Sequence, residues 1–398
     1  MSVFRAGTNK SSVNNFPSIR PTLDLDFANS KTLDPRITFT RASGGSYVGA
    51  DGLIKYAGVN EPRFDHDPET GESLGLLIEE SRTNLVLNSL SGYSNVFPQN
   101  ATVTTGLDAP DGSNTAIRVS CRTTGSTLIR LYTPTLSNNV TYTVSFYVRL
   151  IGGDTSFINS LRSDICDNAS INYLPLLIRN KWVKITYSGF GQTNLNFIDL
   201  LSDNPNNYTL DFWGAQLEVG SFPTSYIPTQ GSTRTRAADF AYIKNIDKTN
   251  WFNKDEGTLI FQHTKIPVSA NQPFKFPAFG FARTEDGDST NTIQYYLSRN
   301  GEGVYLVRNI NNIFELSIGV SQTESTVGFN YKTNEFSISR NGLLMRQIFS
   351  GALPLNFYML VIGINRIFSS DQQINAHCKY LRYYPKSLPN LQLQQLTR

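Results

Sequence analysis

One segment near the middle of the chain constrains the fold most. Apolar and polar residues alternate over residues 210–219, which is the period of a β-strand with one buried face. Gly220 ends this pattern, and Pro223 and Pro228 favour an extended exit because proline fixes φ and donates no backbone hydrogen bond. The segment is therefore predicted to be the last strand of a β-sandwich that leads into a linker, about halfway along the chain.

The composition indicates a β-rich globular protein with more than one domain. A chain of 398 residues suits two or three domains. Aromatic residues make up 12% and charged residues only 17%, which does not fit a disordered chain. The net charge is +3 and the basic residues are scattered, so we expect no nucleic-acid partner.

The cysteines and the apolar runs indicate in which cellular compartment the chain is expected to fold. Cys121, Cys166 and Cys378 form no CxxC pair, which argues against a zinc site or a disulfide framework and favours buried free thiols. Residues 1–15 lack the apolar segment of a signal peptide, and the apolar run 357–364 is too short to span a bilayer. We expect a protein made in the host cytoplasm, without membrane insertion.

Strand-like runs separated by Gly, Asn, Asp and Pro clusters predict an all-β fold with two β-sandwich domains. The clearest turn is Asn341-Gly342, since both residues tolerate positive φ. A short helix is expected from about Pro389 to Leu396. The predicted parts are an N-terminal arm (1–21), a β-rich connector (22–84), a jelly-roll sandwich (85–228), a linker (229–256) and a second sandwich (257–398).

Four segments carry a family resemblance. Residues 36–43, 75–85 and 213–218 resemble phage-encoded tail, fibre and virion structural proteins that contain a carbohydrate-binding-like jelly roll. Residues 381–385 are similar to the close of a concanavalin-A-like or laminin-G-like sandwich in the same proteins. The resemblance implies a place in the virion, contacts with other virion proteins and a homo-oligomer, with a trimer as the expected state. It supplies no catalytic motif.

The resemblance also bears on where residues 22–84 pack. Laminin-G-like domains bring their two termini together, so a strand at 22–27 can complete the C-terminal sheet. Leu23, Leu25 and Phe27 would then form the inner face of that strand. Packing of residues 22–84 on the first sandwich is the alternative, and both stay open at this point.

An acidic pair and the three histidines are the candidate catalytic or metal-binding groups. Asp24 and Asp26 share one face of a strand, as glycosidase carboxylates do, but Asn29 stands where a proton donor is needed. His66 lies between two aspartates, and a polar loop is the simpler interpretation. His263 and His377 lie in apolar strands and are expected to be packed. Residues 285–291 place oxygens at alternate positions, which suits structural calcium, but the distal bidentate Glu of an EF-hand is missing. A plain acidic loop is therefore favoured, and no cofactor is expected.

Aromatic residues are the candidate sugar contacts, because the C–H faces of sugars match aromatic rings. Trp182 and Trp213 lie within strand patterns and are predicted to be core residues. The candidates for glycan or subunit contacts are Trp251, Phe252, Tyr93 and Tyr226, the two tyrosines being expected in exposed loops.

Arg234 and Arg236, together with Asp239, are predicted to form an ion-pair cluster that docks the linker. A solvated linker is the alternative. Docking is favoured because the apolar residues 240–243 that follow must be covered.

The sequence thus predicts a non-enzymatic phage virion structural protein, as a tail fibre, an adaptor or a capsid-surface fibre attached by its N-terminal part. A glycan-binding adhesin for host surface polysaccharide is the alternative. A third hypothesis, a polysaccharide depolymerase, would require Asp24 or Asp26 for cleavage.

Overall fold

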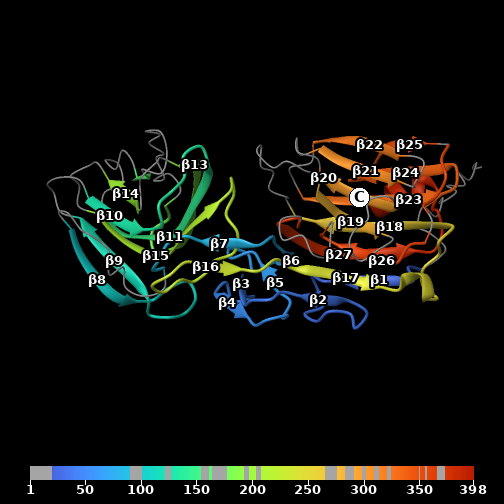
Figure 1. Cartoon of the computed structure of the whole chain (residues 1–398). Coiled ribbons are helices and arrows are strands. Elements are labelled where there is room, and N and C mark those ends of the chain that lie inside the picture. Colours follow the sequence, from blue (N-terminus) through green and yellow to red (C-terminus); the bar gives the residue numbers. More distant parts are fainter. Residues whose placement is uncertain are drawn as a thin grey trace, which may run out of the picture.

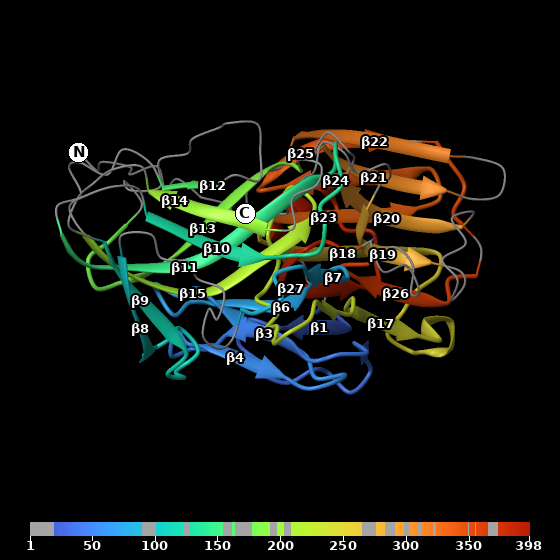
Figure 2. The same ribbon diagram turned by 60° about the vertical axis from the view of Figure 1, so that its left-hand side comes forward.

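Two β-sandwiches and a smaller β layer between them make up the computed structural model (Figure 1). The structure describes residues 20–89, 101–121, 127–153, 161–163, 177–191, 197–202, 208–264, 276–282, 291–297, 302–308, 313–320, 324–348, 350–354, 356–364 and 373–398. The all-β prediction is confirmed, because the described elements are antiparallel strands apart from one 3₁₀ turn, η3 (Ile246–Lys248), and one short helix, α1 (Asn390–Leu396). The two sandwiches appear in both views, in green and in orange (Figures 1 and 2).

The first sandwich is formed by residues between 101 and 219. Its larger sheet has the order β13-β11-β15-β9-β8 and its smaller sheet the order β10-β14-β12. The core between the sheets is apolar, with Val144, Phe146, Leu210 and Leu217 almost fully buried. The strands are β8 (Ala101–Leu107), β9 (Ala116–Cys121), β10 (Thr127–Tyr132), β11 (Thr141–Gly153), β12 (Leu161–Ser163), β13 (Trp182–Phe190), β14 (Phe197–Ser202) and β15 (Tyr208–Val219).

The C-terminal sandwich has two larger sheets. One has the order β25-β24-β23-β18-β27-β6-β5, with β1 also paired to β27, and the other has the order β2-β17-β26-β19-β20-β21-β22. The first sheet contains β1 (Leu23–Asp26), β5 (Phe64–His66), β6 (Ser73–Ile78), β18 (Glu256–His263), β23 (Ser325–Lys332), β24 (Glu335–Arg340), β25 (Leu343–Ile348) and β27 (Ala376–Tyr384). The second contains β2 (Thr38–Thr40), β17 (Phe240–Lys244), β19 (Phe276–Ala282), β20 (Thr292–Leu297), β21 (Glu302–Arg308), β22 (Ile313–Val320) and β26 (Met359–Ile362).

The segment predicted as a connector supplies strands to this C-terminal sandwich. Strand β1 pairs antiparallel with β27, so that Leu23 lies opposite Tyr383. Leu23, Leu25 and Phe27 are buried in the same core as Leu259 and Phe281. This confirms both the inner face predicted for residues 22–27 and their completion of the C-terminal sheet.

The predicted linker, residues 229–256, is likewise part of the folded structure. Strand β17 pairs with β2 on one side and with β26 on the other. Strand β16 (Arg234–Arg236) pairs with β7 (Arg82–Asn84). The segment is therefore not a solvated linker: its apolar residues 241–243 are buried in this sheet, which is the covering that the favoured docking prediction required.

The smaller layer contains a hairpin of β3 (Gly45–Val48) and β4 (Ile54–Ala57). Ile54 of this hairpin packs with Trp213 and Tyr226, which places the hairpin against the first sandwich. In Figure 1 the hairpin lies below the junction of the two sandwiches, beside β5 and β16. The prediction that Trp213 is a core residue is confirmed.

Local signals account for several details. Asn341 and Gly342 have φ of 48° and 78° between β24 and β25, the conformation that the hairpin prediction required. Gly214 has φ of 65° and lies where the pairing of β11 with β15 shifts register, as in a β-bulge. The helix α1 begins after Pro389, as predicted, and packs on β23 and β24.

Candidate functional site

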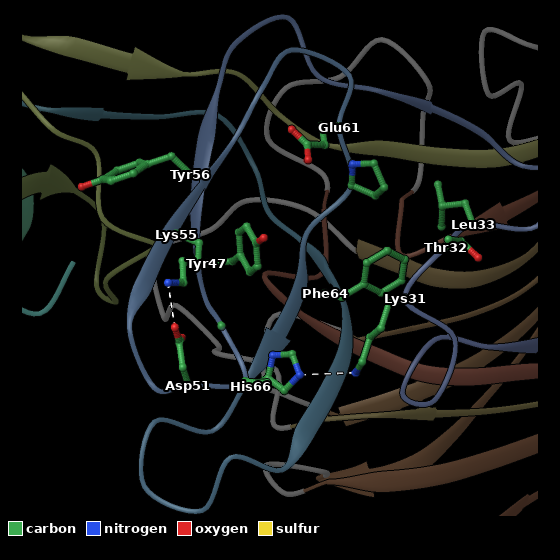
Figure 3. Close-up of a pocket in the computed structure, with 13 residues that line it drawn as sticks. Lys31, Thr32, Leu33, Tyr47, Asp51, Lys55, Tyr56, Glu61, Phe64 and His66 are labelled. Carbon is green, nitrogen blue, oxygen red and sulfur yellow. Dashed lines mark hydrogen bonds and ion pairs between the residues drawn. The ribbon is translucent and has the colours of Figure 1, made fainter. Parts of the chain in front are cut away.

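A cleft of about 980 Å³ lies in the smaller β layer. It lies between the β3–β4 hairpin, strand β5 and the loop at residues 31–33 (Figure 3). We call it the cleft; its residues are Lys31, Thr32, Leu33, Tyr47, Gly49, Ala50, Asp51, Lys55, Tyr56, Glu61, Pro62, Phe64 and His66. Its volume is at the upper end of the usual range for small-molecule sites.

Aromatic side chains form the middle of the cleft. Tyr47 is half-buried on β3, and Phe64 is 8% exposed on β5. In Figure 3 the Tyr47 ring lies next to Lys55, and the Phe64 ring lies next to Lys31. Tyr56 is 47% exposed on β4 and points away from the other cleft residues. The pairing of the two hairpin strands places Tyr47 beside Lys55 on one face of the hairpin, and Tyr56 with Ser46 and Ile54 on the other.

The polar groups of the cleft are fixed by hydrogen bonds. Lys31 Nζ donates to the carbonyl of Ala28 at 2.9 Å and to Ser73 Oγ at 2.8 Å, and lies 3.3 Å from His66 Nε2. Lys55 forms an ion pair of 2.7 Å with Asp51. The Glu61 carboxylate accepts a hydrogen bond from the amide of Gly58. The cleft thus combines apolar ring faces with oriented donors and acceptors, which is what a sugar requires.

Behind the hairpin lies a buried group of charges that we call the ionic seam: Arg41, Arg63, Glu79, Arg236 and Asp239. Arg41 Nη1 lies 3.1 Å from Asp239, and Arg63 Nη1 lies 2.7 Å from Glu79. Arg63 Nη2 also donates to Asp239. All five side chains are at most 6% exposed. The seam joins residues in or next to β2, β5, β6 and β16. Arg63 also donates to the carbonyl of Ser46 in β3, and Glu79 accepts hydrogen bonds from Ser225, so the seam fixes the hairpin to the C-terminal sandwich and to the segment after β15.

Neighbouring charges determine the protonation of the seam. Burial acts to raise the pKa of Glu79, but Arg236 and Arg63 outweigh it and hold that pKa well below its usual range. Burial acts to lower the pKa of Arg63, and Asp239 and Glu79 outweigh it, so the pKa is raised. Glu79 and Arg63 therefore stay ionised across the physiological pH range.

Of the residues predicted to contact sugars, Tyr226 is corrected. It is 3% exposed, its ring lies 4.5 Å from that of Trp213, and its hydroxyl donates to the carbonyl of Ser89. An exposed loop was expected here, but the loop folds back over β15 and buries the ring. Tyr93 lies outside the described residues.

Trp251 and Phe252 lie at the edge of the C-terminal core. Their rings are 5.9 Å apart, and each packs against Tyr383. Both are partly buried and neither lines the cleft. Their contact with a glycan or with another subunit stays a prediction.

The three residues predicted to dock the linker separate in the structure. Arg236 and Asp239 belong to the ionic seam, with side chains at most 1% exposed. Arg234, two residues earlier on the same strand, is exposed. Asp239 accepts from Arg41 and Arg63. Arg234 and Arg236 project from the same face of β16, because they are two residues apart, but only Arg236 is buried.

The catalytic and metal-binding candidates are distributed over separate places. Asp24 pairs with Arg382 at 3.0 Å, and Asp26 accepts hydrogen bonds from Asn29, both away from the cleft. No group of three or more metal-ligating side chains occurs within the described ranges. The candidate calcium loop, 285–291, is described only at Asn291. In the same described part, no helix is long and apolar enough to cross a membrane.

The histidines are packed, but one lies in an arrangement that the sequence did not indicate. His377 Nε2 lies 2.8 Å from Asp65 Oδ2, and His377 Nδ1 lies 3.0 Å from Thr264 Oγ1. Thr264 Oγ1 also accepts from the amide of His377. His66 is 6% exposed at the cleft wall, contrary to the polar loop expected there. Sequence reasoning also missed Lys31, Tyr47, Tyr56 and Phe64, which come from the 31–33 loop and three different strands.

No protein-family model and no curated protein matches the chain. Among solved structures, the CBM40 of the Ruminococcus gnavus IT-sialidase bound to α2,6-sialyllactose is similar at 12% identity, covering 39% of this chain and 92% of that one, with a TM-score of 0.33. A Trypanosoma rangeli sialidase is similar at 13% identity, over 40% of this chain and 26% of that one, with a TM-score of 0.33. Likenesses of this size carry no argument about function.

Proposed function

We propose that the protein binds carbohydrate through the cleft. The observation that carries this is the composition of the cleft wall: the rings of Tyr47 and Phe64 lie next to Lys55 and Lys31, with the carboxylates of Asp51 and Glu61 at the margin. Sugar rings pack their C–H faces on aromatic side chains, while their hydroxyls exchange hydrogen bonds with such charged groups. The protein would recognise a glycan on a host cell surface.

The cleft would bind without cleaving. Glycoside hydrolysis requires a carboxyl acid and a second carboxylate that are both available at the scissile bond. Asp51 is held by Lys55 and Glu61 by a backbone amide, and Asp24 and Asp26 lie elsewhere. This supports a non-enzymatic role over the depolymerase hypothesis.

We further propose that this glycan-binding protein is a structural component of a phage virion, as a tail fibre, an adaptor or a capsid-surface fibre. The support is the resemblance of residues 36–43, 75–85 and 213–218 to phage structural proteins. Attachment would use the N-terminal part, in a homo-oligomer for which a trimer is the expected state. Electron microscopy of native particles, labelled with an antibody against residues 257–398, tests this: label on projections supports it, and particles without label contradict it.

The binding proposal is tested with a glycan array probed by the full chain and by two variants. Tyr47→Ala removes a ring from the cleft, and we expect it to reduce the signal about tenfold, given the contribution of a stacked ring. Phe190→Ala is the matched control, since Phe190 is 50% exposed on β13 and away from the cleft. Equal signals for Tyr47→Ala and the wild type, or no glycan bound at all, would contradict the proposal. Circular dichroism establishes that both variants are folded.

A further inference from the structure

A second cavity lies on the other side of the β3–β4 hairpin, between the hairpin and strand β16. It has a volume of about 360 Å³, near the lower end of the range for small-molecule sites. Its walls include Tyr56, Asp111, Arg234 and Arg236. Tyr56 also lines the cleft, so the cleft and this small cavity share one exposed aromatic side chain.

The ionic seam next to the small cavity carries an excess of positive charge. It contains three arginines, Arg41, Arg63 and Arg236, but only two carboxylates, Glu79 and Asp239. The neighbouring pair of Arg82 and Glu80 is neutral and leaves this balance unchanged. A buried charge that lacks a counter-charge is unfavourable, so an anion held beside the seam would be stabilised.

Arg236 brings this charge to the cavity wall. Its side chain is 1% exposed, and Nη1 and Nη2 each donate to a carbonyl, at 3.2 Å to Ala237 and at 2.7 Å to Glu80. Its Nε has no hydrogen-bond partner, although Glu79 lies 3.5 Å away. A Cβ at Gly45 would come within 3.3 Å of Arg236 and of Arg41, so glycine keeps the wall over these arginines thin.

At the rim, Arg234 supplies a second cation. It is exposed, and it forms no ion pair within the part of the chain that the structure describes. The carboxylate of Asp111, the one acidic side chain along the described wall, accepts hydrogen bonds from the Tyr56 hydroxyl at 3.2 Å and from Ser113. Two arginines therefore face one carboxylate that is already engaged, and the cavity favours an anion.

We infer that the small cavity binds the carboxylate of an acidic sugar, a uronic acid residue of the glycan. The carboxylate would lie by Arg234, close to the positive seam, because arginine binds carboxylates with two parallel hydrogen bonds. The sugar ring would pack against Tyr56, and the neighbouring residues of the glycan would continue into the cleft. This inference rests on the proposed glycan binding and names the class of sugar that the protein selects.

Isothermal titration of the full chain at pH 7 and low salt compares two sugars that differ only in the charged group, glucuronate and glucose. We expect glucuronate to bind at least tenfold more tightly. Arg234→Gln should weaken glucuronate binding about tenfold, the effect of losing one charged hydrogen-bonding partner, and should leave glucose unchanged. Arg36→Gln is the matched control, because Arg36 is an exposed arginine of the same layer that lines neither hollow.

The outcomes separate this inference from the proposed function. Equal binding of glucuronate and glucose, with loss of both in Tyr47→Ala, overturns the inference and leaves glycan binding in place. Competition by inorganic phosphate at the affinity of glucuronate overturns the sugar assignment, since the cavity would then be a general anion site. Glucuronate binding that weakens equally in Arg234→Gln and Arg36→Gln also overturns it, because only bulk charge would be involved.

Discussion

Leu259 and Phe261 in the C-terminal sandwich are surrounded by aliphatic and aromatic side chains, whereas Arg41, Arg63 and Asp239 are equally buried and are surrounded by charges. The apolar core gains stability from contact area, which many combinations of side chains can supply. The seam depends on each charge having its partner, because a buried charge left alone is strongly unfavourable. The cores of the sandwiches should therefore tolerate many apolar substitutions. The layer that carries the cleft is instead held in one orientation by a few specific ion pairs.

The largest effect is expected from Asp239→Ala. This change leaves Arg41 and Arg63 buried without their shared carboxylate, and we expect a loss of about 3–5 kcal/mol in the free energy of unfolding. Urea denaturation followed by circular dichroism measures it. Asp255→Ala is the control, since Asp255 is 75% exposed in its pair with Lys254 and should change stability very little. Similar values for the two variants would show that the seam is not what holds the layer.

Lowering the pH should destabilise the C-terminal sandwich more than the first sandwich. Burial lowers the pKa of His263 from 6.5 to about 4, so the unfolded chain binds a proton at this residue before the folded protein does. Stability conferred by the neutral imidazole is therefore complete above pH 6.5 and is lost as the pH falls toward 4, by about 2 kcal/mol between pH 8 and pH 5. Residues 85–228 contain no histidine.

Hydrogen exchange at pH 8 and pH 5, corrected for the intrinsic rate, measures the opening free energy of each sandwich separately. We expect the opening free energy of β18 and its neighbours to fall more than that of β11 and β15. In His263→Gln this difference should disappear. A first sandwich that loosens as much as the second one would contradict the assignment to His263.

A charge cluster in the first sandwich is more exposed than the ionic seam and shows how much exposure lowers the effect of losing a carboxylate. Asp211 is fully buried and accepts hydrogen bonds from Arg118 and Arg149, but those arginine side chains are 32% and 19% exposed. In Asp211→Asn they can turn toward water, so we expect a loss of about 1–2 kcal/mol, less than for Asp239→Ala. Urea denaturation of both variants under one condition tests the order. An equal or larger loss in the free energy of unfolding for Asp211→Asn would mean that the exposure of the paired arginines does not determine the size of the loss.

The smallest effect is expected from Tyr226→Phe. The hydroxyl of Tyr226 donates to Ser89 across the edge of the first sandwich, and its removal should cost about 1 kcal/mol. Tyr226 lines the small cavity, but the change keeps its ring and removes only a hydroxyl that is bonded to Ser89, so glycan binding should not change. Thermal unfolding and the glycan array together measure this, and a variant with weakened binding but unaltered stability would return Tyr226 to the list of sugar contacts.

The parts of the fold that could be predicted are those in which one local pattern determines the structure. Alternation placed Leu23, Leu25 and Phe27 on a buried face, and Asn341-Gly342 marked a hairpin because its φ values suit few other residues. The seam could not be predicted, since Arg41 and Asp239 are 198 residues apart and no period relates them. The cleft arises from the same long-range assembly, which is why Lys31 and Tyr47 were not recognised as neighbours.

The most direct test of the account is hydrogen exchange of the full chain with and without the glycan that the array selects. Binding at the cleft predicts slower exchange at residues 45–57 and 61–66, with the outer strands of both sandwiches unchanged. Protection confined to a face of either sandwich, with residues 45–66 unaffected, would contradict the assignment of the binding site to the layer that the ionic seam holds.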